Sequence, residues 1–403
     1  MSNRELFERN VAQTIGSMDA EKIFSADRQL IIKYGVDATA PFLHLGHAVN
    51  LWMMRELQDI GHKVVFLIGD YTTQIGDPTG KSSTRPILSK DEINLNAEAF
   101  IEQVGIVLRK DPDLFEVRRN SEWFDTMSAK DMLDLLSMVS HAHLISRDMF
   151  QERIANGHEI RMHEMIYPIL QGYDSAVLKS DLTIVGSDQL FNESMGRFFQ
   201  EKFGIPQLQT IITSVITAGI DGKAKQSKSL GNYIALADTP TDKFGKAMSI
   251  PDHLIIPYLS TYTGLSNNEI SKITNQLEIE QQNPMIAKSI LAYEIVARYH
   301  GTEIATQEKE LFLDRYSRKT ISAAQEIIVE PQLNVLQLVQ AANPEMNFSK
   351  IRTLFNGNAI SIDMGKISPA TIKADKPHDA PLDYKDGSIL KVGKKQYYKL
   401  KIL

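Results

Sequence analysis

The sequence predicts an α/β fold in which a parallel sheet is followed by a helical domain and a small α+β domain. Three observations support this prediction. Short apolar runs alternate with helical segments over residues 1–235, helical periodicity dominates residues 236–331, and short strands and turns fill residues 332–403. A chain of 403 residues is too long for one ordinary hydrophobic core, so we expect two or three domains.

The parallel sheet is predicted from two strands and the helix between them. Residues 30–36 and 63–69 are short runs rich in apolar and β-branched side chains. Residues 44–60 place apolar side chains at three- and four-residue spacings, and Gly61 is positioned as a C-cap. A strand, a helix and a strand in this order form a right-handed βαβ unit, as in a Rossmann-like sheet.

Two later runs, residues 182–185 and 210–216, resemble further strands of the same sheet, and each leads into a polar loop. Because open parallel sheets bind ligands just beyond the carboxyl ends of their strands, these loops are candidate binding segments.

The middle of the chain is predicted to be helical. Ser266 is a candidate N-cap for a helix over 267–277, and residues 284–299 and 302–318 continue in the same style. The pattern breaks at Val329-Glu330-Pro331, which sets the second domain boundary.

Composition excludes several kinds of chemistry. The chain has no cysteine, so disulfides, zinc–thiolate sites, iron–sulfur clusters and a cysteine nucleophile are excluded. It has no apolar run of membrane-spanning length, and MSNRELFERN lacks the apolar stretch of a secretory signal. We therefore expect a soluble protein of the cytoplasm that binds no membrane.

Charge is distributed unevenly along the chain. The net charge is -6, yet residues 341–403 carry eleven Lys or Arg against six Asp or Glu. A basic carboxyl-terminal segment on an otherwise acidic chain is typical of a catalytic core joined to a domain that binds the phosphate backbone of a nucleic acid. The alternative is that this segment is merely a solvated tail.

The sharpest local motif is His44-Leu45-Gly46-His47 at the start of the first crossover helix. A helix N-terminus attracts phosphate, and histidines three residues apart lie on one face of a helix. They could donate hydrogen bonds to the oxygens of an attacked α-phosphate. The alternatives are a metal pair, for which no third ligand is evident, and a chance pair of polar residues.

The second motif is Lys225-Gln226-Ser227-Lys228-Ser229. Two lysines three residues apart in a loop flanked by glycines form a cationic clamp suited to a triphosphate. Such a loop alone is usually solvated surface. A functional role is favoured here because the loop follows a predicted strand of the sheet and lies far along the chain from the histidine pair.

The segment from Gly76 to Arg85 superficially suggests a phosphate loop. The required pattern needs a glycine where the chain has Ile75, so a nucleoside-triphosphatase P-loop is rejected. Instead, Asp77 can pair with a substrate ammonium, while Lys81 and Arg85 could reach leaving phosphates.

A polar stripe marks the helix predicted around residue 170. Tyr167, Gln171 and Asp174 share one face at helical spacing, in an otherwise apolar segment. Buried polar groups need partners, and a bound amino acid with an ammonium and a hydroxyl would supply them; a solvated face is the alternative.

Together these motifs resemble class I aminoacyl-tRNA synthetases, specifically the bacterial tyrosyl-tRNA synthetases, nearly from end to end. His44–His47 looks like the "HIGH" signature, and Lys225–Ser229 looks like "KMSKS". Residues 37–41 resemble the family's D-P-T-A-P segment, and Gly186–Gln189 matches its G-[ST]-D-Q loop. The carboxyl end resembles the small ribosomal-protein-like RNA-binding fold that many members carry.

The resemblance implies roles for matching residues around ATP. His44 and His47, with Thr39, would stabilise the α-phosphate. The departing pyrophosphate would be held by Lys81, Arg85, Lys225 and Lys228. Contacts with ATP are implied for Gly46, Gly186, Asp188, Lys225, Lys228 and Ser229.

The resemblance also implies an amino-acid site. Asp77, Tyr167 and Gln171 would bind the ammonium of tyrosine, Gln189 its carboxylate and Asp174 its phenol hydroxyl. Magnesium is expected to accompany ATP or pyrophosphate, with no metal ligand assigned in the protein.

The chain departs from the family pattern at several positions. Ala38 stands where Pro is usual, and Val185 where Gly is usual. Many members place a second tyrosine against the phenol, but the aligned residue here is Lys33, next to Tyr34, which leaves that contact unassigned. Gln226 replaces the Met of the second signature, so we expect a changed loop equilibrium and no loss of activity.

The implied activity is that of a tyrosine–tRNA ligase, which forms tyrosyl-adenylate from ATP and then charges tRNA(Tyr) for translation. The implied domains are a catalytic domain (1–235), a helical anticodon-binding domain (236–331) and an RNA-binding domain (332–403). We expect a homodimer with contacts near residues 125–165, and we expect that the protein does not bind DNA. The alternatives are a tryptophan-activating enzyme, an inactive RNA-binding paralogue and a small-molecule nucleotidylyltransferase.

Overall fold

The computed structural model describes residues 3–39, 42–76, 88–227, 230–322, 324–363, 365–372, 374–393 and 396–403, without the side chains of 315–322 and Lys366. The chain divides into two compact units, Met1–Lys309 and Glu310–Leu403.

A six-stranded sheet organises the first unit, in the order β1-β6-β5-β2-β3-β4. Its strands are β1 (Val11–Ile15), β2 (Ile31–Val36), β3 (Lys63–Ile68), β4 (Phe115–Arg119), β5 (Leu182–Val185) and β6 (Thr210–Ser214). All neighbours pair in parallel except β1, which runs antiparallel to β6. The predicted α/β class and the four predicted strands are confirmed.

The two edge strands were not predicted. The residues of β4 are only half-buried and include Glu116, Arg118 and Arg119, while most of β1 is exposed. Parallel strands read as apolar runs only where helices cover both faces, and these edges lack that signature.

The first crossover helix is α3 (Leu45–Gln58), and it confirms the predicted βαβ unit. Asp59 is the C-cap, two residues earlier than expected. Gly61 has φ of +96° and therefore forms the turn that leads into β3.

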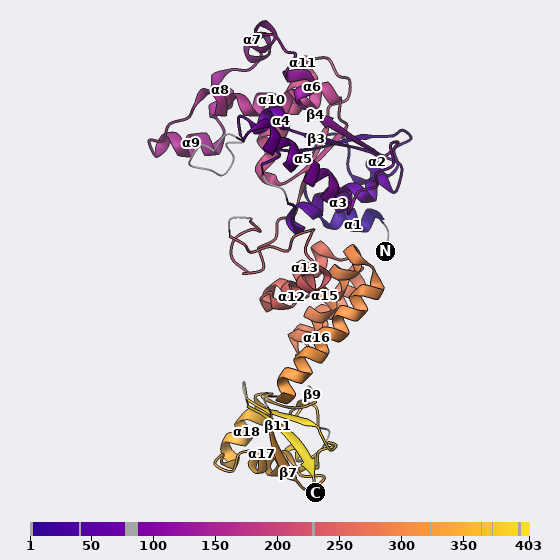
Figure 1. Cartoon of the computed structure of the whole chain (residues 1–403), viewed down its shortest axis with the longest axis vertical. Helices are drawn as coiled ribbons and strands as arrows, with labels where there is room; N and C mark the ends of the chain where they lie inside the picture. The colour runs from indigo at the N-terminus through magenta and orange to yellow at the C-terminus, as the bar shows by residue number, and fades with distance from the viewer. Residues whose placement is uncertain are drawn as a thin grey trace. The chain divides into compact units, whose positions relative to one another are not determined.

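Further helices surround the sheet in Figure 1. They are α1 (Asn3–Arg9), α2 (Ala20–Phe24), α4 (Asp70–Thr73), α5 (Lys90–Val104), α6 (Ser121–Phe124), α7 (Ala129–Ser137), α8 (His141–Ile145), α9 (Asp148–Ala155), α10 (Met162–Leu178) and α11 (Leu190–Lys202), with a 3₁₀ turn at Ser187–Gln189.

Helices α10 and α11 pack closely because glycine removes the side chain at their contact. A Cβ atom at Gly172 would lie 2.8 Å from the backbone carbon of Met195. This close approach lets polar residues of the two helices meet, as Gln171 and Glu193 do.

After the sheet the first unit is helical, with α12 (Pro240–Ser249), a 3₁₀ turn at Asp252–Leu254, α13 (Ile255–Tyr262), α14 (Asn267–Glu278) and α15 (Pro284–His300). Helix α16 (Thr302–Ser322) begins in the first unit and ends in the second. The Ser266 hydroxyl accepts the Glu269 N–H and caps α14 as predicted. The change from strands to helices falls between β6 and α12. The domain boundaries near 235 and 332 stay predictions.

The second unit has its own sheet, in the order β7-β11-β10-β8-β9, and its own buried core. The strands are β7 (Gln325–Val329), β8 (Ile360–Ile362), β9 (Gly365–Ile367), β10 (Ile389–Val392) and β11 (Gln396–Ile402). Helices α17 (Val335–Ala342) and α18 (Phe348–Asn356) lie beside this sheet (Figure 1), and a 3₁₀ turn covers Pro377–Asp379. The predicted small α+β fold is confirmed.

Candidate active site

A cavity of about 390 Å³ opens at the carboxyl ends of β2, β5 and β6. The predicted site residues that line it are Thr39, His44, Gly46, His47, Tyr167, Gln171, Asp174, Gly186, Asp188, Gln189 and Lys225. The other predicted residues, Asp77, Lys81, Arg85, Lys228 and Ser229, lie outside the described residues. Side chains from opposite ends of the first 235 residues therefore share one cavity.

The two histidines form the N-terminal cap of α3. The Nδ1 atom of His44 accepts the Gly46 N–H at 3.2 Å, and the Nδ1 atom of His47 accepts the His44 N–H at 3.3 Å. A neutral imidazole whose Nδ1 accepts carries its proton on Nε2. The ring centroids lie 3.9 Å apart, so two Nε2–H donors lie close together at the positive end of a helix.

Backbone pairing brings the lysine loop to this helix end. The Leu45 N–H donates to the Ile234 carbonyl at 3.0 Å, and the Leu236 N–H donates to the Leu43 carbonyl at 2.9 Å. The loop before Ile234 is thereby tied to the histidine turn. Lys225 reaches the cavity from this loop, and its Nζ atom lies 3.7 Å from the Oδ2 atom of Asp188.

Gln226 connects the same loop to helix α13. Its side chain is 7% exposed, and its Nε2 donates to the Tyr262 hydroxyl at 2.7 Å. Tyr262 also contacts the Thr217 hydroxyl. Burial raises the pKa of Tyr262, so its phenol stays protonated. The unusual residue of the second motif thus ties the loop to the helical part of the unit.

The polar stripe on α10 has partners within the protein. Tyr167 donates to Asp37 Oδ2 at 2.9 Å, and Gln171 Nε2 donates to Glu193 Oε1 at 2.9 Å. The alternative interpretation, that the stripe is a solvated face, is therefore wrong, because Tyr167 is buried and the stripe faces the cavity.

Asp174 is the carboxyl group of the stripe and is buried, at 3% exposure. Its Oδ1 accepts the Trp123 indole N–H at 3.0 Å, and its Oδ2 accepts from Asn120 Nδ2 at 3.4 Å. Burial raises the pKa of Asp174 to about 8, against the opposing influence of the nearby Lys33 ammonium and of these two donors. The group can thus change its protonation near neutral pH.

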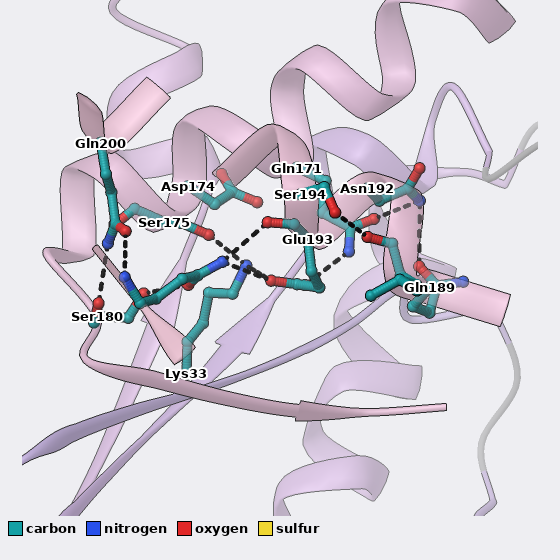
Figure 2. Close-up of polar contacts among 12 residues, drawn as sticks. Lys33, Gln171, Asp174, Ser175, Ser180, Gln189, Asn192, Glu193, Ser194 and Gln200 are labelled. Atoms are coloured by element: carbon teal, nitrogen blue, oxygen red, sulfur yellow. Dashed lines mark hydrogen bonds and ion pairs between the residues drawn. The ribbon is translucent and has the colours of Figure 1, made fainter. Parts of the chain in front are cut away.

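A buried ion pair lines the cavity, and Figure 2 shows its polar contacts. Lys33 Nζ is 2.9 Å from Glu193 Oε2, and the two side chains are 1% and 2% exposed. Glu193 also accepts from Gln209, and Asn192 links Gln171 to Gln189 through 2.8 and 3.1 Å hydrogen bonds. One network therefore connects Gln171 and Gln189, the residues predicted to hold the ammonium and the carboxylate of an amino acid.

Sequence reasoning missed five polar residues of this region, namely Asp37, Asn120, Trp123, Asn192 and Glu193. One signal for Glu193 was present: Lys33 stands in the middle of a strand predicted to be buried, and a buried cation requires a counter-ion. The sequence pattern does not show which carboxylate is the counter-ion, because that depends on how α11 packs.

Ala38, which stands where Pro was expected, has a local explanation. Its N–H donates to the Thr73 hydroxyl at 3.0 Å, a bond that proline could not make. Val185 is buried and lines the cavity next to Gly186.

Among the described residues, no cluster of three or more His, Asp or Glu side chains has the arrangement of a metal site. No described helix has the length and apolar character needed to span a bilayer.

Comparisons with known proteins agree with this geometry. The family described as "tRNA synthetases class I (W and Y)" matches residues 25–317. A tyrosine–tRNA ligase of Thermotoga maritima is 37% identical and covers 98% of this chain and 96% of its own. One from Dehalococcoides mccartyi is 38% identical and covers 98% and 97%.

Solved structures give the same fold at lower sequence identity. A C-terminally truncated mitochondrial tyrosyl-tRNA synthetase of Aspergillus nidulans aligns with a TM-score of 0.62 at 22% identity, over 78% of this chain and 94% of that one. A Plasmodium falciparum tryptophanyl-tRNA synthetase aligns with a TM-score of 0.54 at 15% identity, over 72% and 80%.

Proposed function

The chain belongs to the bacterial tyrosyl-tRNA synthetases of class I, and from this premise we propose how its cavity activates tyrosine and charges tRNA(Tyr). The observation that carries the proposal is the meeting of two imidazoles, a lysine loop and a polar amino-acid pocket around one cavity.

The first step joins tyrosine to the nucleotide. A carboxylate oxygen of tyrosine attacks the α-phosphorus of ATP, the bond to the β-phosphate breaks, and pyrophosphate leaves with the electron pair. His44 and His47, with Thr39, donate hydrogen bonds where charge grows on the α-phosphate. Lys81, Arg85, Lys225 and Lys228 hold the pyrophosphate, and no residue acts as a covalent nucleophile.

The substrates are positioned by the remaining predicted residues. Gly46, Gly186, Asp188 and Ser229 contact ATP, while Asp77, Tyr167, Gln171 and Gln189 hold the ammonium and carboxylate of tyrosine. Asp174 accepts the phenol hydroxyl. Magnesium arrives on the phosphates rather than in a resident protein site.

The second step transfers tyrosine to RNA. A hydroxyl of the terminal ribose attacks the tyrosyl carbonyl, the bond to AMP breaks, and the hydroxyl proton leaves with the AMP phosphate or solvent. The helices over 236–331 and the basic module over 332–403 are proposed to bind the tRNA. Because charging supplies translation, we expect the protein in the cytoplasm.

A homodimer is also proposed. Large apolar side chains of α7, α9 and the start of α10 are exposed, among them Leu133 at 66% and Met162 at 71%. Exposed apolar groups in one region favour a protein interface. Sedimentation equilibrium tests this: a monomer at micromolar concentration would contradict it.

Amino-acid-dependent exchange of pyrophosphate into ATP, measured with each of the twenty amino acids, tests the activity. We expect exchange with tyrosine alone. Exchange with tryptophan instead would favour the tryptophan-activating alternative, and exchange with none would favour an inactive RNA-binding paralogue.

Lys228→Ala tests the lysine loop separately. It should slow adenylate formation far more than it weakens tyrosine binding, because the loop acts on the phosphates. An equal loss of tyrosine affinity would make Lys228 structural.

A further inference from the structure

Lys33 presents an ammonium group to the cavity. Its Nζ pairs with Glu193 Oε2 at 2.9 Å and donates to the Ser175 hydroxyl at 2.7 Å (Figure 2). An ammonium has three N–H donors, and these two partners use two of them. The third N–H has no other partner among the described residues, and Lys33 lines the cavity.

Glu193 holds the ammonium in place from the opposite side. Its Oε1 accepts from Gln171, and its Oε2 accepts from Gln209 at 3.1 Å as well as from Lys33. Because every polar atom of the Glu193 carboxylate is engaged, the carboxylate cannot follow a moving lysine. The orientation of the Lys33 ammonium is therefore fixed before any substrate enters.

Asp174 lies near this ammonium and also lines the cavity. Each of its oxygens accepts one hydrogen bond, from Trp123 and from Asn120, and a carboxylate oxygen has room for a second. The same end of the pocket therefore holds an ammonium donor and a carboxyl acceptor, supplied by β2 and α10.

We propose that Lys33 donates its third N–H to the phenol oxygen of bound tyrosine while the phenol O–H donates to Asp174. This inference rests on the proposed function and names a second residue that selects the substrate. A phenol hydroxyl is both a donor and an acceptor, so this pair recognises both capacities. Phenylalanine would leave the third N–H of Lys33 and the remaining acceptor position of Asp174 without a hydrogen bond.

A purely structural Lys33 is the competing interpretation, in which the lysine only neutralises Glu193. Truncating one member of a buried ion pair leaves the other charge uncompensated and is strongly destabilising. Single substitutions therefore cannot separate the two interpretations. The double variant Lys33→Met, Glu193→Leu removes both charges at similar volume and can.

The test uses three substrates that differ only at the para position of the ring. Tyrosine can donate and accept, 4-aminophenylalanine donates but is a poor acceptor, and phenylalanine does neither. We expect the double variant to raise the KM for tyrosine roughly tenfold to a hundredfold, the value of a charged hydrogen bond. The KM for 4-aminophenylalanine should change far less, and discrimination against phenylalanine should fall.

The matched control removes a second buried ion pair that does not line the cavity. Arg153 and Glu164 are 2.7 Å apart with side chains 12% and 7% exposed. The variant Arg153→Met, Glu164→Leu should alter stability while leaving the ratio between the three substrates unchanged. Equal changes for all three substrates in the Lys33 variant, or no change, would overturn the proposal.

A pH profile gives a second readout, because the charge of Lys33 acts on the titration of Asp174. The groups facing Asp174 are Lys33 from β2, Glu193 from α11, and the neutral side chains of Asn120 and Trp123. Lys33 lowers the pKa of Asp174 more than Glu193 raises it. Removing both should therefore shift the acidic limb of the tyrosine profile to higher pH, and an unmoved limb would count against the proposal.

The outcomes separate this inference from the proposed function. If the unmodified protein shows no tyrosine-dependent exchange, the function fails. If the unmodified protein is active and its preference for tyrosine survives the double substitution, only the inference fails.

Discussion

The raised pKa of Asp174 predicts that this residue, which we propose selects tyrosine, also weakens the fold, and Asp174→Asn separates the two effects. The substitution keeps the shape of the side chain and removes its titration. The amide oxygen of the variant can still accept the Trp123 N–H, but its amide nitrogen meets the Asn120 amide nitrogen, which lies 3.4 Å from the present oxygen. This mismatch costs about 1 kcal/mol at every pH.

The loss of the titrating carboxyl acts in the opposite direction, because it stabilises the variant relative to the unmodified protein as pH rises. Unfolded, the Asp174 carboxyl ionises near 3.8, whereas in the folded protein its pKa is about 8. Between these values the native state holds a proton that the unfolded state has released, so the contribution of Asp174 to the free energy of unfolding is greatest below pH 3.8 and falls as pH rises. The slope is about 1.4 kcal/mol per pH unit, or about 2.7 kcal/mol between pH 5 and pH 7.

The assay is urea unfolding of the unmodified protein and of Asp174→Asn at several pH values. Taking the difference between the two proteins cancels every other titrating group. The free energy of unfolding of the variant should gain on that of the unmodified protein across this range, while tyrosine-dependent exchange is severely weakened. A difference that stays constant from pH 5 to pH 8 would show that Asp174 is ionised throughout and would refute the reasoning.

Three further predictions concern packing, the loop and the second unit. Gly172→Ala should lower the free energy of unfolding by about 2 kcal/mol, because the new Cβ would meet the Met195 backbone at 2.8 Å; an unchanged urea midpoint would mean that α10 and α11 can separate freely. Gln226→Met and Tyr262→Phe should each retain activity, and their double-mutant cycle should show a coupling of about 1 kcal/mol in unfolding, whereas additive effects would mean that their hydrogen bond does not form. Removing residues 324–403 should leave tyrosine-dependent exchange intact and reduce charging of tRNA at least tenfold; equal charging by the shortened chain would free the second unit of any role in binding RNA.

The fold could be predicted where burial leaves a simple pattern. The runs that became β2, β3, β5 and β6 are covered on both faces, so they are almost wholly apolar and stand out from the helices between them. The half-exposed edge strand β4, with alternating charges, shows no such pattern. Its place beside β3 follows from pairing across distant parts of the chain.

The site was predictable in its motifs and not in its network. His44 and His47 reveal themselves by their spacing at a helix start, and Lys225 by its loop. Glu193 carries no comparable local signature, because its role arises only when α11 packs beside α10 and turns it toward Lys33. Long-range packing of this kind determines which polar residues meet.

The buried pair of Lys33 and Glu193 also constrains how this pocket can be redesigned. A library that varies one position at a time contains variants in which one buried charge has lost its counter-ion. Such variants are unstable, so selection would discard them before any new specificity appears. We therefore expect strong epistasis between positions 33 and 193. Programmes that seek to load unnatural aromatic amino acids onto tRNA with this scaffold should randomise both codons together.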